Sequence, residues 1–290
     1  MALIAILLSL TLERLLGSLE GLRNFRWFTA WSAWLRRQLP EESAWGGAAG
    51  VVLLLLPPLL ALSLLLHLLD DLWMPLSFLV GVLVLLYSIG PKDLGAEVDA
   101  FIAARERDDE EAAQWHAQAL LGKELPDSSR RLTQMLMENI LAEVNRRLVA
   151  VFFWFAVLGP FGALLYRLAT LLHDSEREHG GGLIDAAARL LGVLDWLPAR
   201  LCAVGYAMSG NFVESIQGWR DDTTPWPESN RALLLASGLG ALGHVEENAE
   251  REVAPERETA RINDTMALVR RMVLVLLALL ALLTLGGWAS

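Results

Sequence analysis

Charged side chains stand at helical spacing in the stretch "RERDDEEAAQWHAQ", residues 105–118. On one continuous helix the stretch would form two faces, with Arg105, Asp109 and His116 near one and Asp108, Glu111 and Trp115 on the other. Carboxylates grouped in this way could hold Mg²⁺ around a phosphate, because Mg²⁺ is bound through one or two carboxylates together with waters and phosphate oxygens. The alternative is a solvated acidic helix face, the usual role of a charge run.

A second stretch, "MENILAEVNRR" (residues 137–147), lies directly before an apolar run that opens at Leu148. Asn139, Glu143 and Arg146 stand at i, i+4 and i+7 and share one helix face. Glu143 can also pair with Arg147 at i+4. One interpretation is a ligand site at the membrane surface, and the other is an ion pair with arginines that extend their stems along apolar surface.

A third stretch, "LDWLPARL" (residues 194–201), places charges inside an apolar segment, where they are costly. Asp195 and Arg200 are five residues apart, about 140° around a regular helix, and therefore do not face each other. Pro198 breaks that regularity and frees a carbonyl group, to which the guanidinium of Arg200 could donate. The pattern is typical either of a proline break bonded by its own arginine or of intramembrane charges that face a ligand.

The elements that position these residues are apolar. The chain has 290 residues, of which 54% are hydrophobic, and the apolar residues are bunched into runs, which is typical of a membrane protein. The net charge of −10 excludes nucleic-acid binding, which needs a basic surface. The single cysteine, Cys202, cannot form an internal disulfide and is interpreted as inert packing. The usual phosphate-loop and zinc motifs do not occur.

Hydropathy and length predict the membrane spans. The spans are expected over Gly47–Leu69, Leu72–Gly90, Leu148–Leu172, Leu183–Met208 and Ala267–Trp288, the first two as a hairpin kinked at Pro57 and Pro58. The apolar N-terminal run is interrupted by Glu13 and Arg14, so residues 1–16 are expected to insert partially or to re-enter the surface. Lysines and arginines flank the hairpin on both sides, which predicts that both flanks are cytoplasmic.

These spans predict an all-α, polytopic helical membrane protein with a cytoplasmic helical insert. The expected segments are 1–90 (N-terminal segment and hairpin), 91–147 (the insert), 148–210 (membrane helices), 211–266 (a polar, loop-rich connection) and 267–290 (the last span). Within the insert, "GKELPDSS" is expected to separate two helices.

Several of these stretches resemble one family. "ARLLGVLDWLPARL" (residues 188–201) is similar to the "ARLDDVxNxxPARL" segment of the CobD/CbiB membrane proteins, and "RERDDE" is similar to their "GRDT" element. "LERLL" near the start, "FFWFAVLGPFGALLYR" (residues 152–167) and "LDWLPARLCAVGYAMSG" (residues 194–210) resemble the AmpE branch of that superfamily. The resemblance extends over nearly the whole chain, and its most specific part is "DWxPxRL".

The resemblance carries two functional implications. CobD-like proteins are ATP-using ligases that join an aminopropanol unit to the corrinoid. AmpE-like proteins are inner-membrane accessory factors linked to β-lactamase induction and cell-wall recycling. The chain departs from the ligase pattern: Leu191 and Gly192 occupy the places of the Asp-Asp pair, Asp195 replaces an Asn, and "AEVNR" stands where the ligases have "ENxxD".

We therefore expect an AmpE-like protein of the bacterial inner membrane, linked to β-lactamase induction and peptidoglycan recycling, that binds a small anionic ligand such as a nucleotide or a muropeptide. The expected pocket is lined by Arg107, Asp108, Glu143, Arg146, Asp195 and Arg200. Arg107 and Arg200 would bind anionic oxygens, and Asp108 would hold Mg²⁺, with ATP or another nucleotide, or would orient an arginine. Expected partners are the lipid bilayer and either a second copy of the chain or other cell-wall-recycling proteins. The alternatives are a CobD/CbiB-like, ATP- and Mg-dependent amide synthase and a scaffold that binds no small ligand.

Overall fold

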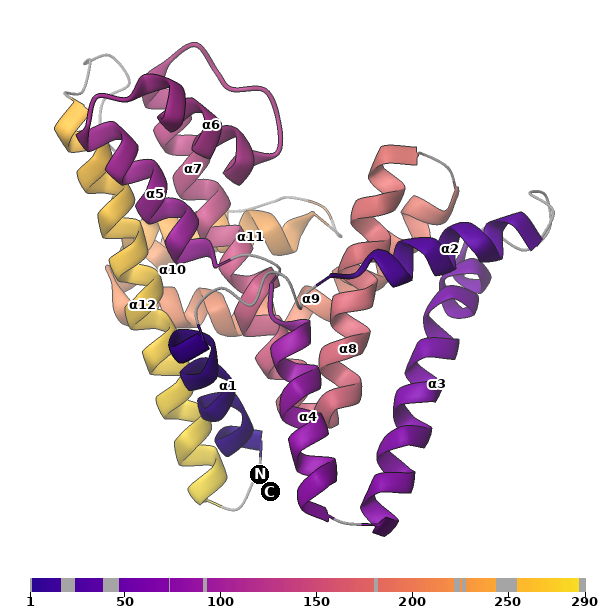
Figure 1. Cartoon of the computed structure of the whole chain (residues 1–290). Helices are drawn as coiled ribbons and strands as arrows, with labels where there is room; N and C mark the ends of the chain where they lie inside the picture. The colour runs from indigo at the N-terminus through magenta and orange to yellow at the C-terminus, as the bar shows by residue number, and fades with distance from the viewer. Residues whose placement is uncertain are drawn as a thin grey trace. The chain divides into compact units, whose positions relative to one another are not determined.

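The computed structural model describes residues 2–16, 24–38, 47–72, 74–90, 93–179, 182–221, 225, 228–243 and 255–286 (Figure 1). Every regular element in these ranges is helical. The elements are α1 (Ala2–Leu16), α2 (Arg26–Gln38), α3 (Ala48–Leu72), α4 (Met74–Ser88), α5 (Leu94–Glu106), α6 (Glu110–Leu121), α7 (Ser129–Val144), a π-helical turn (Asn145–Val149), α8 (Ala150–His179), α9 (Gly182–Ser209), α10 (Phe212–Asp221), α11 (Ser229–Ala241) and α12 (Pro255–Leu285).

Among the described residues, four helical stretches are long and apolar enough to cross a membrane. They are Ala48–Asp70, Ser129–Arg177, Leu183–Ser209 and Arg257–Leu285. Leucines such as Leu56, Leu60 and Leu64 are exposed on α3 although they are strongly apolar. A helix that is apolar on all faces is stable in lipid, where its backbone groups are bonded internally. The chain is therefore an all-α polytopic membrane protein, and the predicted spans are confirmed as helices.

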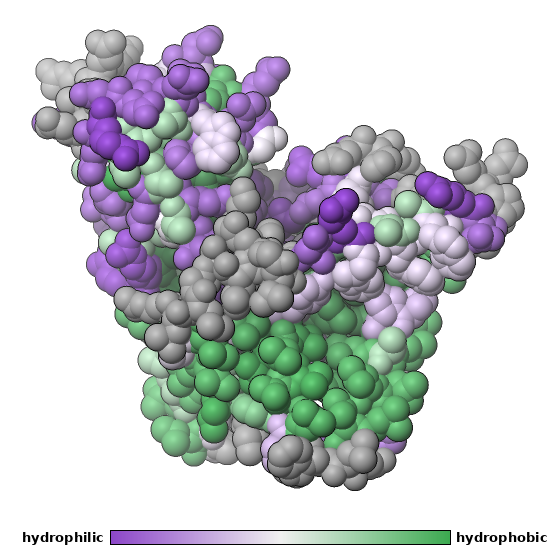
Figure 2. All heavy atoms as spheres, in the orientation of Figure 1, coloured by the Kyte–Doolittle hydropathy of each residue, from purple (hydrophilic) through white to green (hydrophobic). Residues whose placement is uncertain are grey.

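The apolar residues gather over α3 and α4 in the space-filling view (Figure 2). The predicted hairpin is present as these two helices, but α4 has only 15 residues. At 1.5 Å per residue that is about 22 Å, less than the roughly 30 Å of a hydrocarbon core. Helix α1, also 15 residues long, is similarly short. The last residues of the span expected over Ala267–Trp288 lie outside the described residues.

The chain divides into two compact units, of which the first comprises residues 1–91, 147–197 and 280–290. In this unit α4 packs against α1 and α8, and α3 packs against α4 and α8. Helix α8 contains a kink that the sequence analysis did not predict, because Gly159 has a φ of 64° and Pro160 follows it. A positive φ is natural for glycine, and proline lacks the N–H that a continuous helix would use.

The second unit comprises residues 92–146 and 198–279. It contains α5, α6, α7, the end of α9, α10, α11 and most of α12. The chain leaves this unit within the π-helical turn and re-enters it at Pro198 within α9. The expectation that residues 211–264 are loop-rich is wrong for much of the segment, because α10 and α11 are regular helices packed against each other (Figure 1).

Close packing of α10 and α11 depends on glycines in the segment that the sequence analysis expected to be loop-rich. A Cβ added at Gly240 would lie 2.5 Å from the backbone oxygen of Glu214, so the two helices approach with almost no side chain between them. Gly238 similarly makes room for the side chain of Leu141 on α7. Small residues that let helices approach closely are a common device in membrane proteins.

Candidate functional site

The first predicted cluster is not one helix. Helix α5 ends at Glu106, Asp108 has a φ of 54°, and α6 starts only at Glu110. The side chain of Asp109 accepts a hydrogen bond from the backbone N–H of Ala112 and so caps α6. Aspartate favours this capping position over a helix interior because its oxygen satisfies an orphan backbone donor. The prediction that residues 105–118 form two faces of one continuous helix is therefore wrong. Arg107 and Asp108 are exposed in the turn between α5 and α6.

Arg105 beside this turn forms a network that sequence reasoning missed. Its guanidinium donates to Glu110 Oε1 at 2.7 Å, to Ser129 Oγ at 2.8 Å and to Glu258 Oε2 at 3.2 Å. Glu258 is only 6% exposed. The network joins α5, α6, α7 and α12. Glu110 is five residues from Arg105, but the other two partners are 24 and 153 residues away, so local spacing could not have revealed them.

The second predicted cluster stands at the other end of α7. Arg146 donates to Glu143 Oε1 at 3.4 Å, and both side chains are largely buried. The sequence analysis noted that Glu143 can pair with Arg147 at i+4, and the structure bonds it to Arg146 at i+3. A π-helical turn starts at Asn145 and shifts the register of the residues that follow. Such turns are frequent at functional sites.

The two predicted clusters are too far apart to share one small ligand. Arg105, two residues before Arg107, touches Ser129, which is the first residue of α7. Glu143 lies 14 residues further along α7, which is about 21 Å at 1.5 Å per residue. Arg107 and Asp108 are thus at one end of α7, and Glu143 and Arg146 are at the other. The grouping of all four in one pocket is not supported.

Arg200 belongs to the same end of α7 as Arg146. Its Nη1 donates to Oδ1 of the buried Asn230 at 3.4 Å, a partner on α11 that the sequence analysis did not name. Tyr206, six residues further along α9, donates from its hydroxyl to the backbone oxygen of Leu141 at 2.9 Å. The end of α9 therefore crosses α7 beside Leu141. Arg146 is about 7.5 Å along α7 from this crossing and Arg200 about 9 Å along α9.

The contacts form two pairs in the second unit, Glu143 with Arg146 and Arg200 with Asn230. We group these four residues as a candidate anion site, called the α7–α9 site, because Arg146 and Arg200 follow and precede the contact between Leu141 and Tyr206 by about 7.5–9 Å of helix. Each pair supplies one arginine, whose planar guanidinium group binds carboxylates and phosphates with paired hydrogen bonds. Glu143 and Asn230 orient the two guanidinium groups. The arrangement can hold an anionic group but contains no nucleophile of its own.

Asp195 lies in the first unit and has a different environment. The hydroxyl of Tyr166 on α8 donates to Asp195 Oδ1 at 2.6 Å, and Tyr166 itself is 0% exposed. Trp154 donates from Nε1 to the backbone oxygen of Leu194 at 3.0 Å. The carboxylate at 195 is therefore bonded to the Tyr166 hydroxyl of α8, and Trp154 of the same helix bonds the backbone beside it. Its 29-residue separation from Tyr166 gave no sequence signal.

Asp108 is the predicted metal ligand. Within the ranges that the structure describes, no three His, Cys, Asp or Glu side chains cluster as ligands of one ion. A Mg²⁺ ion on a phosphate needs only one or two carboxylates, and the exposed carboxylate of Asp108 has the right chemistry. The metal assignment stays a prediction.

The fold defines a class: a polytopic, all-helical membrane protein with charged side chains buried between its helices. A family model described as "CobD/Cbib protein" matches residues 6–245, and the chain belongs to this family. The chain is similar to "Cobalamin biosynthesis protein CobD" of Chromobacterium violaceum, with 31% identity over 204 residues, 68% of this chain and 63% of the relative. It is also similar to the protein of the same name in Stutzerimonas stutzeri, with 32% identity over 194 residues, 59% of this chain and 62% of the relative.

The match to "Protein AmpE" of Shigella flexneri is weaker, with 30% identity over 164 residues, 49% of this chain and 54% of the relative. The matched region thus spans less than two thirds of the length of each of these three relatives. No solved structure matches. The comparisons support the CobD/CbiB family better than the AmpE branch that the sequence analysis favoured.

Proposed function

We propose that the chain acts in cobalamin biosynthesis as a CobD-like membrane protein that holds an anionic group of its substrate with Arg146 and Arg200. The observation that carries this proposal is the family match over residues 6–245, which includes both arginines. Two guanidinium groups near one helix crossing have the charge to bind a carboxylate or a phosphate. A CobD-like reaction joins an aminopropanol unit to a corrinoid acid with ATP, so both kinds of anion occur among its reactants.

The test uses the purified full chain in nanodiscs with ATP, Mg²⁺, a corrinoid acid and aminopropanol. Amide formation is measured by mass spectrometry. We expect turnover by the parent protein and a loss of about 10- to 100-fold in Arg200→Gln, because a charge-assisted pair is worth about 1.5–3 kcal/mol. Arg220→Gln, an exposed arginine at the end of α10, is the matched control and should retain full activity. Absence of any amide product contradicts the proposal.

A second variant, Asp108→Ala, tests in the same assay which of the two clusters holds the reactants. Asp108 lies about 21 Å from the α7–α9 site by the length of α7. If Mg²⁺ and ATP are held beside Arg107, Asp108→Ala abolishes turnover while Arg200→Gln does not. If the α7–α9 site holds the reactants, the opposite result is expected.

A second candidate function, an AmpE-like regulator, is favoured by one specific observation. Leu191, which occupies the place of a carboxylate in the ligase pattern, is a core residue with 7% exposure. A packed leucine at this position replaces a potential Mg²⁺ ligand by a contact that stabilises α9. This candidate predicts that deletion of the gene changes β-lactamase activity after an inducer is added and leaves cobalamin-dependent growth unchanged.

The orientation is proposed from the arginines that flank the hairpin: inner membrane, with residues 91–147 in the cytoplasm. The chain allows a clean labelling test because its one cysteine, Cys202, is buried. Glu111→Cys, at an exposed position of α6, should react with a membrane-impermeant maleimide only after the inner membrane is opened. Labelling in intact spheroplasts contradicts the orientation.

A further inference from the structure

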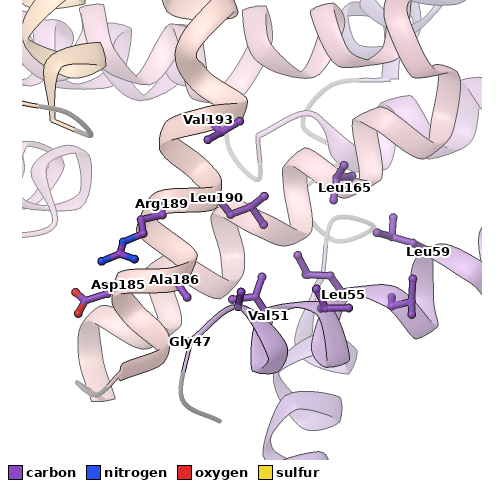
Figure 3. A pocket seen from close by; sticks show the side chains of 13 residues that line it. Gly47, Val51, Leu55, Leu59, Leu165, Asp185, Ala186, Arg189, Leu190 and Val193 are labelled. Atoms are coloured by element: carbon purple, nitrogen blue, oxygen red, sulfur yellow. The ribbon is translucent and has the colours of Figure 1, made fainter. Parts of the chain in front are cut away.

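An apolar groove in the first unit has no role in the proposed function. It measures about 590 Å³ and lies between α3 and the beginning of α9, with Leu165 of α8 in its lining (Figure 3). Its volume is that of a typical ligand cavity. On the α3 side it is lined from Gly47 to Leu59 by valines and leucines. On the α9 side it is lined by Asp185, Ala186, Arg189, Leu190 and Val193.

The length of the groove matches one leaflet of a bilayer. Gly47 and Leu59 are 12 residues apart, which is about 18 Å along a helix. Half of a typical hydrocarbon core is about 15 Å. Because the apolar run of α3 starts at Ala48, Gly47 marks the water-facing end of the groove, and Leu59 marks the end at middle depth.

Two opposite charges stand at the water-facing end. Figure 3 shows the carboxylate of Asp185 and the guanidinium of Arg189 projecting on the same side of α9, and both residues line the groove together with Gly47. Both side chains are exposed. In the part of the chain that the structure describes, neither forms an ion pair or hydrogen bond, although their i, i+4 spacing would permit a mutual pair.

We propose that this groove binds one phospholipid with a primary ammonium head group, phosphatidylethanolamine. One acyl chain lies along Val52, Leu56 and Val193, which are exposed apolar residues of the lining. The phosphate accepts hydrogen bonds from Arg189, and the ammonium group donates to Asp185. The pair of charges selects this head group by its chemistry. A phosphatidylglycerol head group carries no cation for Asp185, and the quaternary ammonium group of phosphatidylcholine has no N–H to donate.

The test is native mass spectrometry of the full chain released from nanodiscs that contain equal amounts of phosphatidylethanolamine, phosphatidylglycerol and phosphatidylcholine. One retained phosphatidylethanolamine per chain is expected, in about tenfold excess over either other lipid. Asp185→Asn with Arg189→Gln should remove this preference. Equal retention of the three lipids, preference for another head group or no retained lipid overturns the proposal.

A second pair of variants tests the groove independently of the charges. Leu56→Trp fills the groove from an exposed position that lines it, and Leu60→Trp adds the same bulk at an exposed position one turn away that does not. Retention should fall about tenfold only in Leu56→Trp. If Leu56→Trp fails to fold, Val52→Phe, also exposed and in the lining, takes its place. Equal effects at the lining and control positions overturn the proposal.

Discussion

Removal of the Tyr166 hydroxyl tests what holds the charge of Asp195 between helices. Tyr166→Phe keeps the ring, so no cavity forms in the completely buried site. It deletes the 2.6 Å hydrogen bond to Asp195 Oδ1. A hydrogen bond to a charged group contributes about 1.5–3 kcal/mol. The free energy of unfolding should fall by this amount, which is roughly a tenfold to hundredfold change in the unfolding equilibrium.

The measurement is reversible unfolding in mixed micelles of increasing SDS content, followed by far-UV circular dichroism. Tyr87→Phe is the control for hydrogen bonds to neutral groups, because the exposed hydroxyl of Tyr87 donates at 3.0 Å to the backbone oxygen of Asn24 and accepts at 2.7 Å from Nε1 of Trp27. Its loss should cost about 1 kcal/mol. A double-mutant cycle with Asp195→Ala then isolates the pair, with an expected coupling of about 1–2 kcal/mol.

Two results would refute the reasoning. The first is a loss in Tyr166→Phe no larger than that in Tyr87→Phe. The second is a coupling energy below about 0.5 kcal/mol, which is the usual additivity of independent sites. Either result would mean that Asp195 is stabilised without Tyr166 and that the charge in "LDWLPARL" has another partner.

Three further predictions concern stability. Arg167 is 5% exposed and donates from Nε to the backbone oxygen of Ser88, the last residue of α4, at 2.6 Å. Arg167→Leu should lower the free energy of unfolding, measured by SDS titration, by about 1.5–3 kcal/mol. An unchanged free energy of unfolding would contradict the conclusion that this hydrogen bond stabilises the contact of α8 with α4. Gly240→Leu forces α10 and α11 apart and should cost about 1–3 kcal/mol in the same titration, whereas an unchanged unfolding midpoint would show that the pair can separate freely. Asp109→Ala removes the cap of α6 and should cost about 1 kcal/mol, seen as faster hydrogen exchange of the Ala112 amide; unchanged exchange would mean that the cap is dispensable.

Residue spacing along the chain predicts some contacts of the candidate site and not others. The pairing of Glu143 with an arginine one helical turn away follows from the sequence, because residues three or four apart are neighbours on any helix. The bond to Arg146 itself does not follow, since a π-helical turn begins at Asn145 and changes the helical register there. The partner of Arg200 could not be predicted either, because Asn230 stands on another helix.

The sequence by itself determined the fold class and the four longest of the expected spans. Apolar runs of span length have one stable solution in a bilayer, a helix that satisfies its own backbone. The sequence did not determine that Gly238 and Gly240 serve helix packing, or that the chain turns at Asp108. Only the tertiary structure decided which charges lie together: α7 separates Asp108 from Glu143, and Tyr166 on α8 reaches Asp195 on α9. The hydropathy of a segment can be read from its own residues, and it decides whether the segment can span a membrane. A buried charge, by contrast, is stabilised by the polar group that the packing of distant helices brings within hydrogen-bond distance.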